Sequence, residues 1–403
     1  MRARLLAVVL LLALVALGAP AVRLSADQIN APIAGAAECV QDFPSAALRD
    51  PRATVVMCGL DNPRGLAFAP EGALYVAEAG RGRLGLSTGA CFTGAGGGSR
   101  CYGATGAISR LSNGRQERVA TGLPSHANAQ GVQAIGPSDI AIVGVPYVTI
   151  GLQQPPAIRE QYAFLADFAR LIQVLPSGRW RSIADLGTYE ADHDPDRVFY
   201  ANPRPDSNPY GLLATPTGRA FLVADAGGNS LLHVGANGDV STYAVFAPHV
   251  EGTRRRDPVP TAAELGPDGG YYVGELTAFP PTAGAANIYR IADASTPPEV
   301  CLSGFSLIID LTFDAAGNLY VLQHSTTPVT QTSSGVVIRV QPDLTQSDVC
   351  AQYQAGTRIT VAGGLTRPTS VIAGPDGALY LSNRGISPDI GQVIRIDPFA
   401  LQQ

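Results

Sequence analysis

Short apolar segments, separated by turns rich in glycine and proline, set the pattern of hydrophobic and polar positions along this chain. The segments are rich in β-branched and aromatic residues, a composition typical of strands. Residues 159–168 are the one stretch whose spacing suggests an amphipathic helix. The pattern therefore predicts an all-β protein built from many short strands.

One unit of this pattern recurs along the chain. It combines a short apolar strand, usually opened by a proline, with a tight turn that contains glycine and a second strand that ends in a polar residue. The first copy runs from Pro63 through Pro70-Glu71-Gly72 to Glu78, and a further strand pair around Asn113-Gly114 follows it. The later copies begin at Pro137, Pro209, Pro260, Ile309 and Pro368. Four strands per unit, repeated at roughly 50 to 70 residues, predict a six-bladed β-propeller of the NHL/TolB-like type with four antiparallel strands per blade.

The two ends of the repeat array complement each other. The sixth copy ends after three strands, whereas residues 53–60 precede the first copy with the same pattern that residues 358–365 show before the sixth. We therefore expect the N-terminal strand to complete the last blade and close the ring, which removes exposed sheet edges. A β-sandwich or an open solenoid would not explain why the missing strand stands at the other terminus. The predicted propeller domain spans residues 53–403.

Three stretches carry a resemblance to a known family: PDSNPYG (205–211), ADAGGNS (224–230) and VGELTAFP (273–280). Here the chain resembles NHL-type six-bladed propellers, especially the ScyD/ScyE family, and the likeness extends over residues 54–398. The resemblance implies the propeller fold and no particular activity. Asp225 with Asn229 resembles the NHL consensus for this loop, which implies a structural role for both residues.

The loops are distributed unequally between the two faces of the predicted disc. Turns between first and second strands, and most turns between third and fourth strands, are tight. The second-to-third loops and one blade crossing are long, and both kinds reach the same face, where ligands are usually bound. The long loops are residues 80–106, 151–168, 187–208, 276–286 and 325–335. Candidate ligand-binding residues on this face are Glu78, Asp139, Asp206, Asn208, Tyr210, Asp225, Asn229, Glu275, Asp310, His324 and Asn383.

Four of these residues form a candidate metal site. Glu78, Asp225, Glu275 and Asp310 could converge at the channel mouth, where hard oxygen ligands would suit Ca²⁺ or another divalent cation. The alternative, favoured by a position that recurs in each blade, is that each carboxylate caps its own loop. Asp192-His193-Asp194-Pro195-Asp196 also places carboxylates at alternate positions, but it lacks the glycine and distal glutamate of an EF-hand. We interpret it as a solvated acidic loop.

Histidine chemistry offers one candidate. The five histidines show no metal-binding spacing, and His324 alone stands beside the predicted loop face, where it could act as a general base. The alternative is a loop histidine that is hydrogen-bonded to a neighbouring backbone group.

The N-terminus indicates export. Arg2 and Arg4 precede an apolar run over residues 5–17 and small residues near 18–21, so residues 1–21 are expected to be a signal peptide and 22–52 an N-terminal extension. The apolar run is shorter than the ~20 residues of a membrane span. We expect no membrane span after signal removal. An even number of cysteines in an exported chain favours disulfides. Proximity suggests the pairs Cys39–Cys58, Cys91–Cys101 and Cys301–Cys350.

The charged residues of the chain exclude some classes of partner and of chemistry. A net charge of −5 argues against nucleic acid, which requires a basic surface. All 28 basic residues are arginines, so lysine Schiff-base chemistry is excluded. No complete catalytic set is present. We expect a secreted or periplasmic monomer that binds a small molecule or a protein as a non-catalytic binding or scaffold propeller. The alternative is a divalent-metal-dependent hydrolase, lactonase or lyase at the channel mouth.

Overall fold

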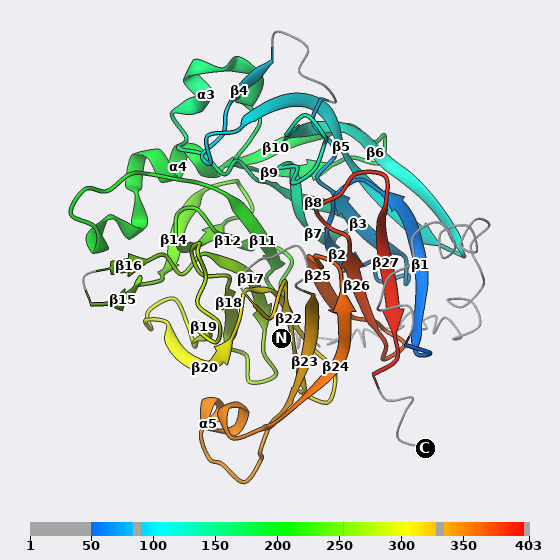
Figure 1. Ribbon diagram of the computed structural model, residues 1–403, viewed down its shortest axis with the longest axis vertical. Coiled ribbons are helices and arrows are strands. Elements are labelled where there is room, and N and C mark those ends of the chain that lie inside the picture. The colour runs from blue at the N-terminus through cyan, green and yellow to red at the C-terminus, as the bar shows by residue number, and fades with distance from the viewer. Residues whose placement is uncertain (1–49, 84–89, 253, 328–333, 399–403) are drawn as a thin grey trace, which may run out of the picture.

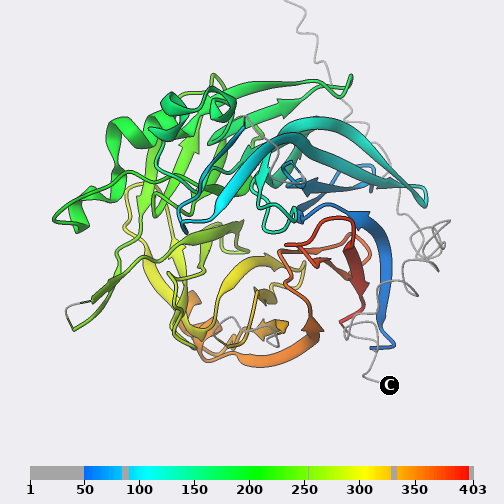
Figure 2. The ribbon, with the colours of Figure 1, turned by 45° about the horizontal axis from the view of Figure 1, so that its top comes forward.

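The computed structural model of this chain describes residues 50–83, 90–252, 254–327 and 334–398. Its strands form six antiparallel four-stranded blades around a central axis, as Figures 1 and 2 show. The predicted six-bladed β-propeller is confirmed. The helical segments of the described residues are α3 (Ile158–Gln161), η2 (Ala163–Leu165), α4 (Leu186–His193), η3 (Pro195–Phe199) and α5 (Val349–Gln354).

The first three blades follow one another along the chain, each running from the axis outward. Blade 1 contains β2 (Pro63–Phe68), β3 (Leu74–Glu78), β5 (Ser99–Ser112) and β6 (Arg115–Ala127), with the short β4 (Cys91–Thr93) paired to β5. Blade 2 contains β7 (Pro137–Val143), β8 (Val145–Ile150), β9 (Arg170–Val174) and β10 (Trp180–Asp185). Blade 3 contains β11 (Pro209–Ala214), β12 (Phe221–Asp225), β13 (Ser230–Val234) and β14 (Val240–Val245).

The other blades repeat this order after a small hairpin of β15 (His249–Glu251) and β16 (Arg254–Arg256). Blade 4 contains β17 (Pro260–Leu265), β18 (Tyr271–Glu275), β19 (Ala286–Ile291) and β20 (Glu299–Phe305). Blade 5 contains β21 (Ile308–Phe313), β22 (Leu319–Gln323), β23 (Gly335–Gln341) and β24 (Thr357–Leu365). Blade 6 contains β25 (Ser370–Ala373), β26 (Leu379–Asn383), β27 (Gly391–Ile396) and the N-terminal β1 (Ala53–Leu60).

The ring closes as the sequence predicts. Strand β1 pairs antiparallel with β27, from Ala53 opposite Ile396 to Leu60 opposite Gly391. In Figure 1 the two ends of the colour scale, blue β1 and red β27, lie side by side. The innermost strands β2, β7, β11, β17, β21 and β25 contact their neighbours in a ring around the channel. Within this ring, the first and last described strands of the chain share one sheet.

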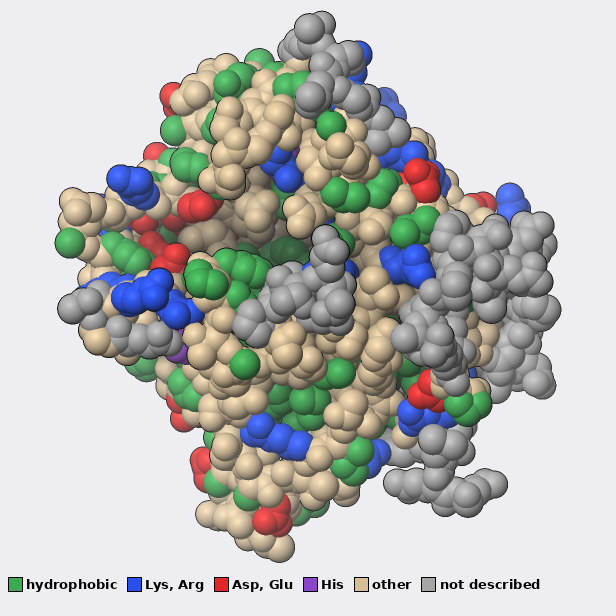
Figure 3. Space-filling model, in the orientation of Figure 1, with side chains coloured by type: hydrophobic (Ala, Val, Ile, Leu, Met, Phe, Trp, Pro, Cys, Tyr) green, Lys and Arg blue, Asp and Glu red, His purple; other side chains and the backbone are tan. Residues whose placement is uncertain are grey.

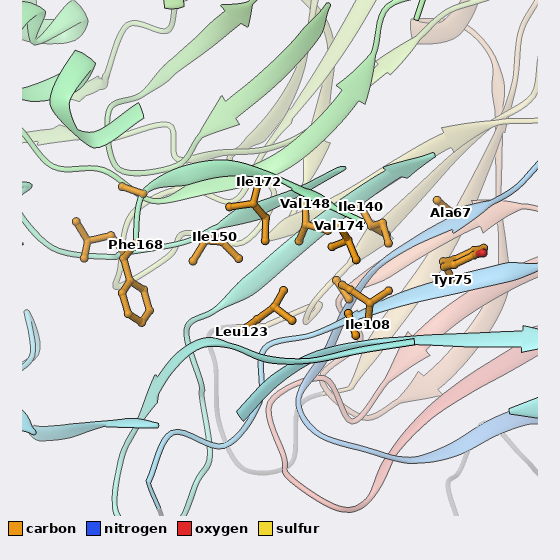
Figure 4. Close-up of a cluster of buried hydrophobic side chains, with 14 of the residues drawn as sticks. Ala67, Tyr75, Ile108, Leu123, Ile140, Val148, Ile150, Phe168, Ile172 and Val174 are labelled. Carbon is orange, nitrogen blue, oxygen red and sulfur yellow. The ribbon is translucent and has the colours of Figure 1, made fainter. Parts of the chain in front are cut away.

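The hydrophobic core lies between neighbouring blades. The cluster between blades 1 and 2 joins Ile108 of β5 to Ile140, Val148 and Ile172 of blade 2, as Figure 4 shows. Similar clusters fill the other interfaces, including the one in which Met57 of β1 lies with residues of blade 1. Because each sheet is covered on both sides, its strands read as apolar runs more than as strict alternation. This packing holds the innermost strands in fixed positions around the channel.

Tight turns occupy one face of the disc. Asp314 accepts hydrogen bonds from the N–H groups of Ala316 and Asn318, and Gly317 between them has a φ of 80°. Such turns explain the recurring Asp and Gly residues. The predicted helix over residues 159–168 is in fact divided into α3 and η2, because Tyr162 is extended, with φ −131° and ψ 97°.

Two of the predicted disulfides are confirmed. Cys91 is bonded to Cys101 across the β4–β5 hairpin, and Cys301 of β20 is bonded to Cys350 of α5. The pair Cys39–Cys58 stays a prediction, because Cys39 lies outside the described residues, as do the expected signal peptide and most of the N-terminal extension. In the described segments no helix has both the length and the hydropathy to cross a membrane. The two disulfides fit an extracytoplasmic protein.

Candidate functional site

A pocket of about 420 Å³ opens at the mouth of the central channel. The floor of the pocket is formed by residues at the start of the innermost strands. Each of them lies at the second position of its strand or next to it: Arg64, Tyr210, Thr261, Ile309 and Thr369. Four of the five long loops predicted to form the binding face supply its walls. Their contributions are Arg100, Gln153, Asp206 and Asn208, and the run from Leu276 to Phe279. Figure 3 shows the hollow near the centre of this face.

Arg64 is the most deeply buried charged group of this pocket, with an exposed fraction of 6%. Its Nη1 donates to the carbonyl of Gly385 at 2.7 Å and its Nη2 to the carbonyl of Ala134 at 2.8 Å. Burial lowers the pKa of its guanidinium group, because charge is poorly solvated there. In the described part of the chain, both of its hydrogen-bond partners are neutral.

Arg100 is a second cation in the same pocket. Its Nε donates to Nδ1 of His126 at 2.9 Å, and its other partners are the carbonyls of His126 and Gln133. Burial and the nearby charge of Arg64 lower the pKa of Arg100 to about 10. His126 is fully buried, and desolvation followed by the Arg100 charge lowers its pKa to about 3, so the imidazole is neutral. The two arginines therefore reinforce each other's positive potential.

Two pocket groups lack a hydrogen-bond partner among the described residues. These are Oδ1 of Asp206 and Oγ1 of Thr277. Both atoms are buried, and neither forms a hydrogen bond with a described residue. Burial, followed by the charge of Asp225, raises the pKa of Asp206 to about 7. Asp206 can therefore hold a proton near neutral pH. Apolar side chains such as Ile309, Leu276 and Ile386 fill much of the remaining wall.

His324 lies in the pocket wall, directly after β22. Its Nδ1 is 2.9 Å from the carbonyl oxygen of Pro368, an acceptor, so Nδ1 carries the proton and Nε2 is the unprotonated nitrogen. Burial lowers the pKa of His324 to about 4. Tyr210 also lines the pocket, and burial raises the pKa of its hydroxyl to about 12.

The predicted metal ligands are not brought together. Glu78 accepts hydrogen bonds from Asp61 N, Ser109 Oγ and the guanidinium group of Arg118. Asp225 accepts from Ser207 Oγ and from the backbone of Asn208, Gly227 and Gly228. Glu275 is bound by Asn287 N, Tyr289 Oη and His249 Nε2. Each of these carboxylates is therefore hydrogen-bonded to groups of its own blade and the adjoining loops, as the loop-capping alternative predicts.

The recurring position at the end of the second strand explains this outcome. In blade 6 Asn383 Oδ1 accepts from Thr366 N at 2.8 Å, and in blade 5 Gln323 Oε1 accepts from Ser306 N at 2.5 Å. Glu78 and Asp225 make the equivalent bond to the segment before their own innermost strand. These side chains join the loop entering each blade to the end of its second strand. Their oxygen atoms are therefore occupied within the protein.

Asp139 and Asp310 occupy equivalent positions on innermost strands of blades 2 and 5. Each accepts backbone N–H bonds from its own strand and from the next blade: Asp139 from Ile140 and Leu212, Asp310 from Leu311 and Val371. Burial, then the charge of Asp310, raises the pKa of Asp139, and burial raises that of Asp310 to about 6. These carboxylates hold neighbouring blades together along the channel.

Of the candidate binding residues, Asp206, Asn208, Tyr210 and His324 line the pocket. Asn229 lies beside it, with its Oδ1 accepting from the backbone N–H of the pocket residue Val259 at 3.2 Å. Sequence reasoning missed Arg64 and Arg100. The sequence does contain a signal for Arg64, because the equivalent position at the start of the innermost strand carries a neutral residue in all five of the other repeats. Arg100 follows a glycine-rich stretch and gives no comparable signal.

Comparisons with known proteins agree with the fold. No family model and no curated protein matches the chain. Among solved structures, a protein of unknown function from Bacteroides thetaiotaomicron has a TM-score of 0.50 at 9% identity, covering 86% of this chain and 75% of that one. The likeness is one of fold.

Two further structures are similar at lower scores. Regucalcin, a calcium-binding protein from Agrobacterium tumefaciens, has a TM-score of 0.47 at 14% identity, covering 85% of this chain and 94% of its own. Virginiamycin B lyase from Staphylococcus aureus has a TM-score of 0.42 at 12% identity, covering 84% and 95%. At these levels neither comparison bears on activity.

Proposed function

We propose that this protein binds a small, partly apolar anion of the carboxylate class in the pocket at the channel mouth. The observation that carries the proposal is the pair of guanidinium groups, Arg64 and Arg100, whose partners in the described residues are all neutral. A buried cation without a counter-charge is unfavourable, and a bound carboxylate would supply that charge through charge-assisted hydrogen bonds.

The remaining pocket groups define the rest of the ligand. Ile309, Leu276 and Ile386 would contact an apolar body, and Tyr210 would offer a planar surface or a hydroxyl donor. Oδ1 of Asp206 and Oγ1 of Thr277 would then bind a polar substituent away from the carboxylate, such as a hydroxyl group. An aromatic or branched hydroxy acid has this combination.

The test is calorimetric titration with a panel of small aromatic and branched aliphatic carboxylates, each beside its neutral amide. We expect the acid to bind at least about tenfold more tightly than the amide, a difference of ~1.4 kcal/mol. Arg64→Met should abolish this preference, and Arg64→Lys should retain part of it. The matched control is Arg179→Met, in an exposed turn on the opposite face. Equal affinity for acid and amide, or a preference that survives Arg64→Met in a folded variant, would contradict the proposal.

A second candidate function is a hydrolase or lyase acting in the same pocket. It is supported by the position of His324, whose unprotonated Nε2 is a basic nitrogen in the pocket wall. The check is turnover of esters and lactones of the acids that bind. If the pocket is catalytic, His324→Gln should lower kcat by about 10²-fold or more while leaving KM within a fewfold. If the pocket only binds, no turnover will accompany binding.

Family and location are parts of the same proposal. All three stretches that resemble the ScyD/ScyE family supply pocket residues: Asp206, Asn208 and Tyr210, then Ala226 and Gly227, then Leu276 to Phe279. Shared residues that gather at one pocket support a common ligand chemistry. Export through residues 1–21 would place this pocket outside the cytoplasm, in agreement with the disulfides.

A further inference from the structure

The crossing from blade 2 to blade 3, residues 187–208, contains a second group of buried charges. Helix α4 begins at Asp185, whose side chain accepts from Thr188 N at 2.9 Å, a standard N-cap. It ends at Asp194, which has a φ of 43°, and Pro195 then opens η3. This turn carries Asp194 and Asp196 back toward Glu190, which lies one helical turn before Asp194.

Glu190, Asp194 and Asp196 form a compact carboxylate group. One oxygen atom from each lies within 4.8 Å of the others, and all three side chains are buried. The interpretation of residues 192–196 as a solvated acidic loop is therefore wrong for Asp194 and Asp196, although Asp192 is exposed.

Glu190 lacks any compensating partner. Its side chain has an exposed fraction of 0%, and within the described residues neither Oε1 nor Oε2 accepts a hydrogen bond. Asp194 Oδ1 is also buried without a partner there. Asp196 is held differently, because its Oδ2 accepts from Asn229 Nδ2 at 2.8 Å. Ion pairs between any of these three carboxylates and an arginine or histidine are absent from the described part of the chain.

This arrangement is unfavourable for the protein alone. Carboxylates removed from water need hydrogen bonds or a counter-charge, and Glu190 has neither. The C-terminal end of α4 adds to the negative potential, because helix carbonyl groups point toward it. Burial, followed by the charges of Asp225 and Asp196, raises the pKa of Glu190 to about 9. A cation at this point would satisfy the unpartnered oxygens together.

We propose that Glu190, Asp194 and Asp196 bind a hard divalent cation, with Ca²⁺ as the principal candidate. All three donors are carboxylate oxygens, and no cysteine or histidine joins the group, which disfavours zinc and copper. Ca²⁺ accepts irregular oxygen geometry and uses backbone carbonyls and water to complete its ligands, whereas Mg²⁺ requires a near-ideal octahedron. The site differs from the predicted set Glu78, Asp225, Glu275 and Asp310.

The cation site is connected to the pocket through two hydrogen bonds. Asn229 donates to Asp196, and its own Oδ1 accepts from the N–H of Val259, which lines the pocket with a φ of 57°. The same crossing also ends in Asp206 and Asn208. A bound cation would therefore hold one wall of the pocket in place. Cation binding at this site is independent of the nature of the pocket's ligand.

The experiment is titration of metal-stripped, full-length mature protein with CaCl₂, followed by calorimetry and by a melting scan. We expect one Ca²⁺ per chain, with a dissociation constant of about 10⁻⁴ M or tighter. Saturating Ca²⁺ should raise the melting temperature by at least ~2 °C, because it binds only the folded state. MgCl₂ should give a smaller shift at equal concentration.

Three variants identify the site. Glu190→Gln and Asp194→Asn should each weaken Ca²⁺ binding by at least about tenfold, whereas Asp192→Asn, the exposed carboxylate on the same helix, should leave it unchanged. In EDTA, where no Ca²⁺ is bound, the Glu190→Gln variant should melt at or above the temperature of the wild type, because an uncompensated buried acid has been removed. Absence of Ca²⁺ binding to the wild type would overturn the proposal. Equal loss of binding in Asp192→Asn and Glu190→Gln would also overturn it.

Discussion

Two groups of buried carboxylates in this protein are neutralised in opposite ways. In blade 1, Asp61 and Glu78 are paired with Arg81 and Arg118, at N–O distances of 2.6 to 3.0 Å. In the crossing between blades 2 and 3, Glu190, Asp194 and Asp196 lie equally buried, and the described residues bring no cation to them. The comparison teaches that acidic composition alone does not locate a metal site. What distinguishes the two groups is whether the chain supplies the counter-charge itself.

The pocket shows the complementary situation. Arg64 and Arg100 are cations bound only by neutral groups among the described residues, yet the uncompensated acids of the crossing do not pair with them. We propose a separate external partner for each group, an anion at the channel mouth and a cation at the crossing. The following predictions test that contrast.

The largest effect is expected from the paired group. Arg118→Met would leave Glu78, which has an exposed fraction of 0%, without its bidentate partner. We expect the free energy of unfolding to fall by about 2.5 kcal/mol, less than for a fully buried pair, because the Arg118 side chain is itself 38% exposed. Chemical denaturation measures it. Arg115→Met is the control, because its side chain is 81% exposed and its loss should change stability by less than ~0.5 kcal/mol.

Carboxylate-to-amide changes should have opposite signs in the two groups. In EDTA at pH 7, Glu78→Gln should lower the free energy of unfolding by about 2 kcal/mol, because it abolishes a hydrogen-bonded ion pair. Under the same conditions Glu190→Gln should raise it by roughly 1 kcal/mol, because the native state no longer has to protonate a buried acid. The denaturation midpoints of both variants measure these opposite changes in stability. If both substitutions destabilised the protein, the proposed difference between the two carboxylate groups would be contradicted.

A smaller effect should follow from moving Glu190 without changing its charge. A Cβ atom at Gly228 would lie 2.5 Å from Oε2 of Glu190. Gly228→Ala should therefore displace this carboxylate and weaken Ca²⁺ binding by about tenfold, or ~1.4 kcal/mol. Gly96→Ala is the matched control, because nothing lies within 4 Å of the added atom. Calorimetry on both variants would contradict the geometry if their affinities were equal.

The smallest effect concerns acids in the channel. Burial, followed by the charge of Asp310, raises the pKa of Glu264 to about 8, and burial raises that of Asp310 to about 6. Both values exceed those of the unfolded chain, so the folded state binds more protons. Their stabilising contribution is complete below about pH 4 and is lost as pH rises through 6 and then 8. Glu264→Gln should flatten the upper part of this dependence in melting scans with Ca²⁺ present; an unchanged slope would contradict it.

The fold could be read from the sequence because its evidence is repeated. Six copies of one strand pair, and the missing strand found before Pro63, together predict the closed ring that β1 and β27 form. The helix over residues 159–168 was predicted less well. Its apolar spacing does not reveal that Tyr162 turns into an extended conformation, since tertiary contacts decide that point.

The sites were harder to predict because they depend on departures from the repeat. The oxygen atoms of Glu78, Asp225 and Glu275 are hydrogen-bonded within their blades, which only the structure shows. Glu190 stands outside the alternating acids of residues 192–196, so the pattern of those acids did not predict it as a site residue. Its relation to Asp194 depends on a helical turn that the cap at Asp185 and Thr188 would have suggested. Arg64 was not predicted either; its one signal in the sequence is a charge at a position that is neutral in the other blades.

The pairing of β1 with β27 has a consequence for biogenesis. Ala53 emerges from the ribosome and from any export channel long before Ile396, yet these residues face each other in the finished sheet. The first strand must therefore wait with an unpaired edge until almost the whole chain has appeared, a long-range contact of the slowest-forming kind. Loss of a few residues from β27 would expose edges on both β1 and β26. Quality control at the end of synthesis would thus depend on the last strand to arrive.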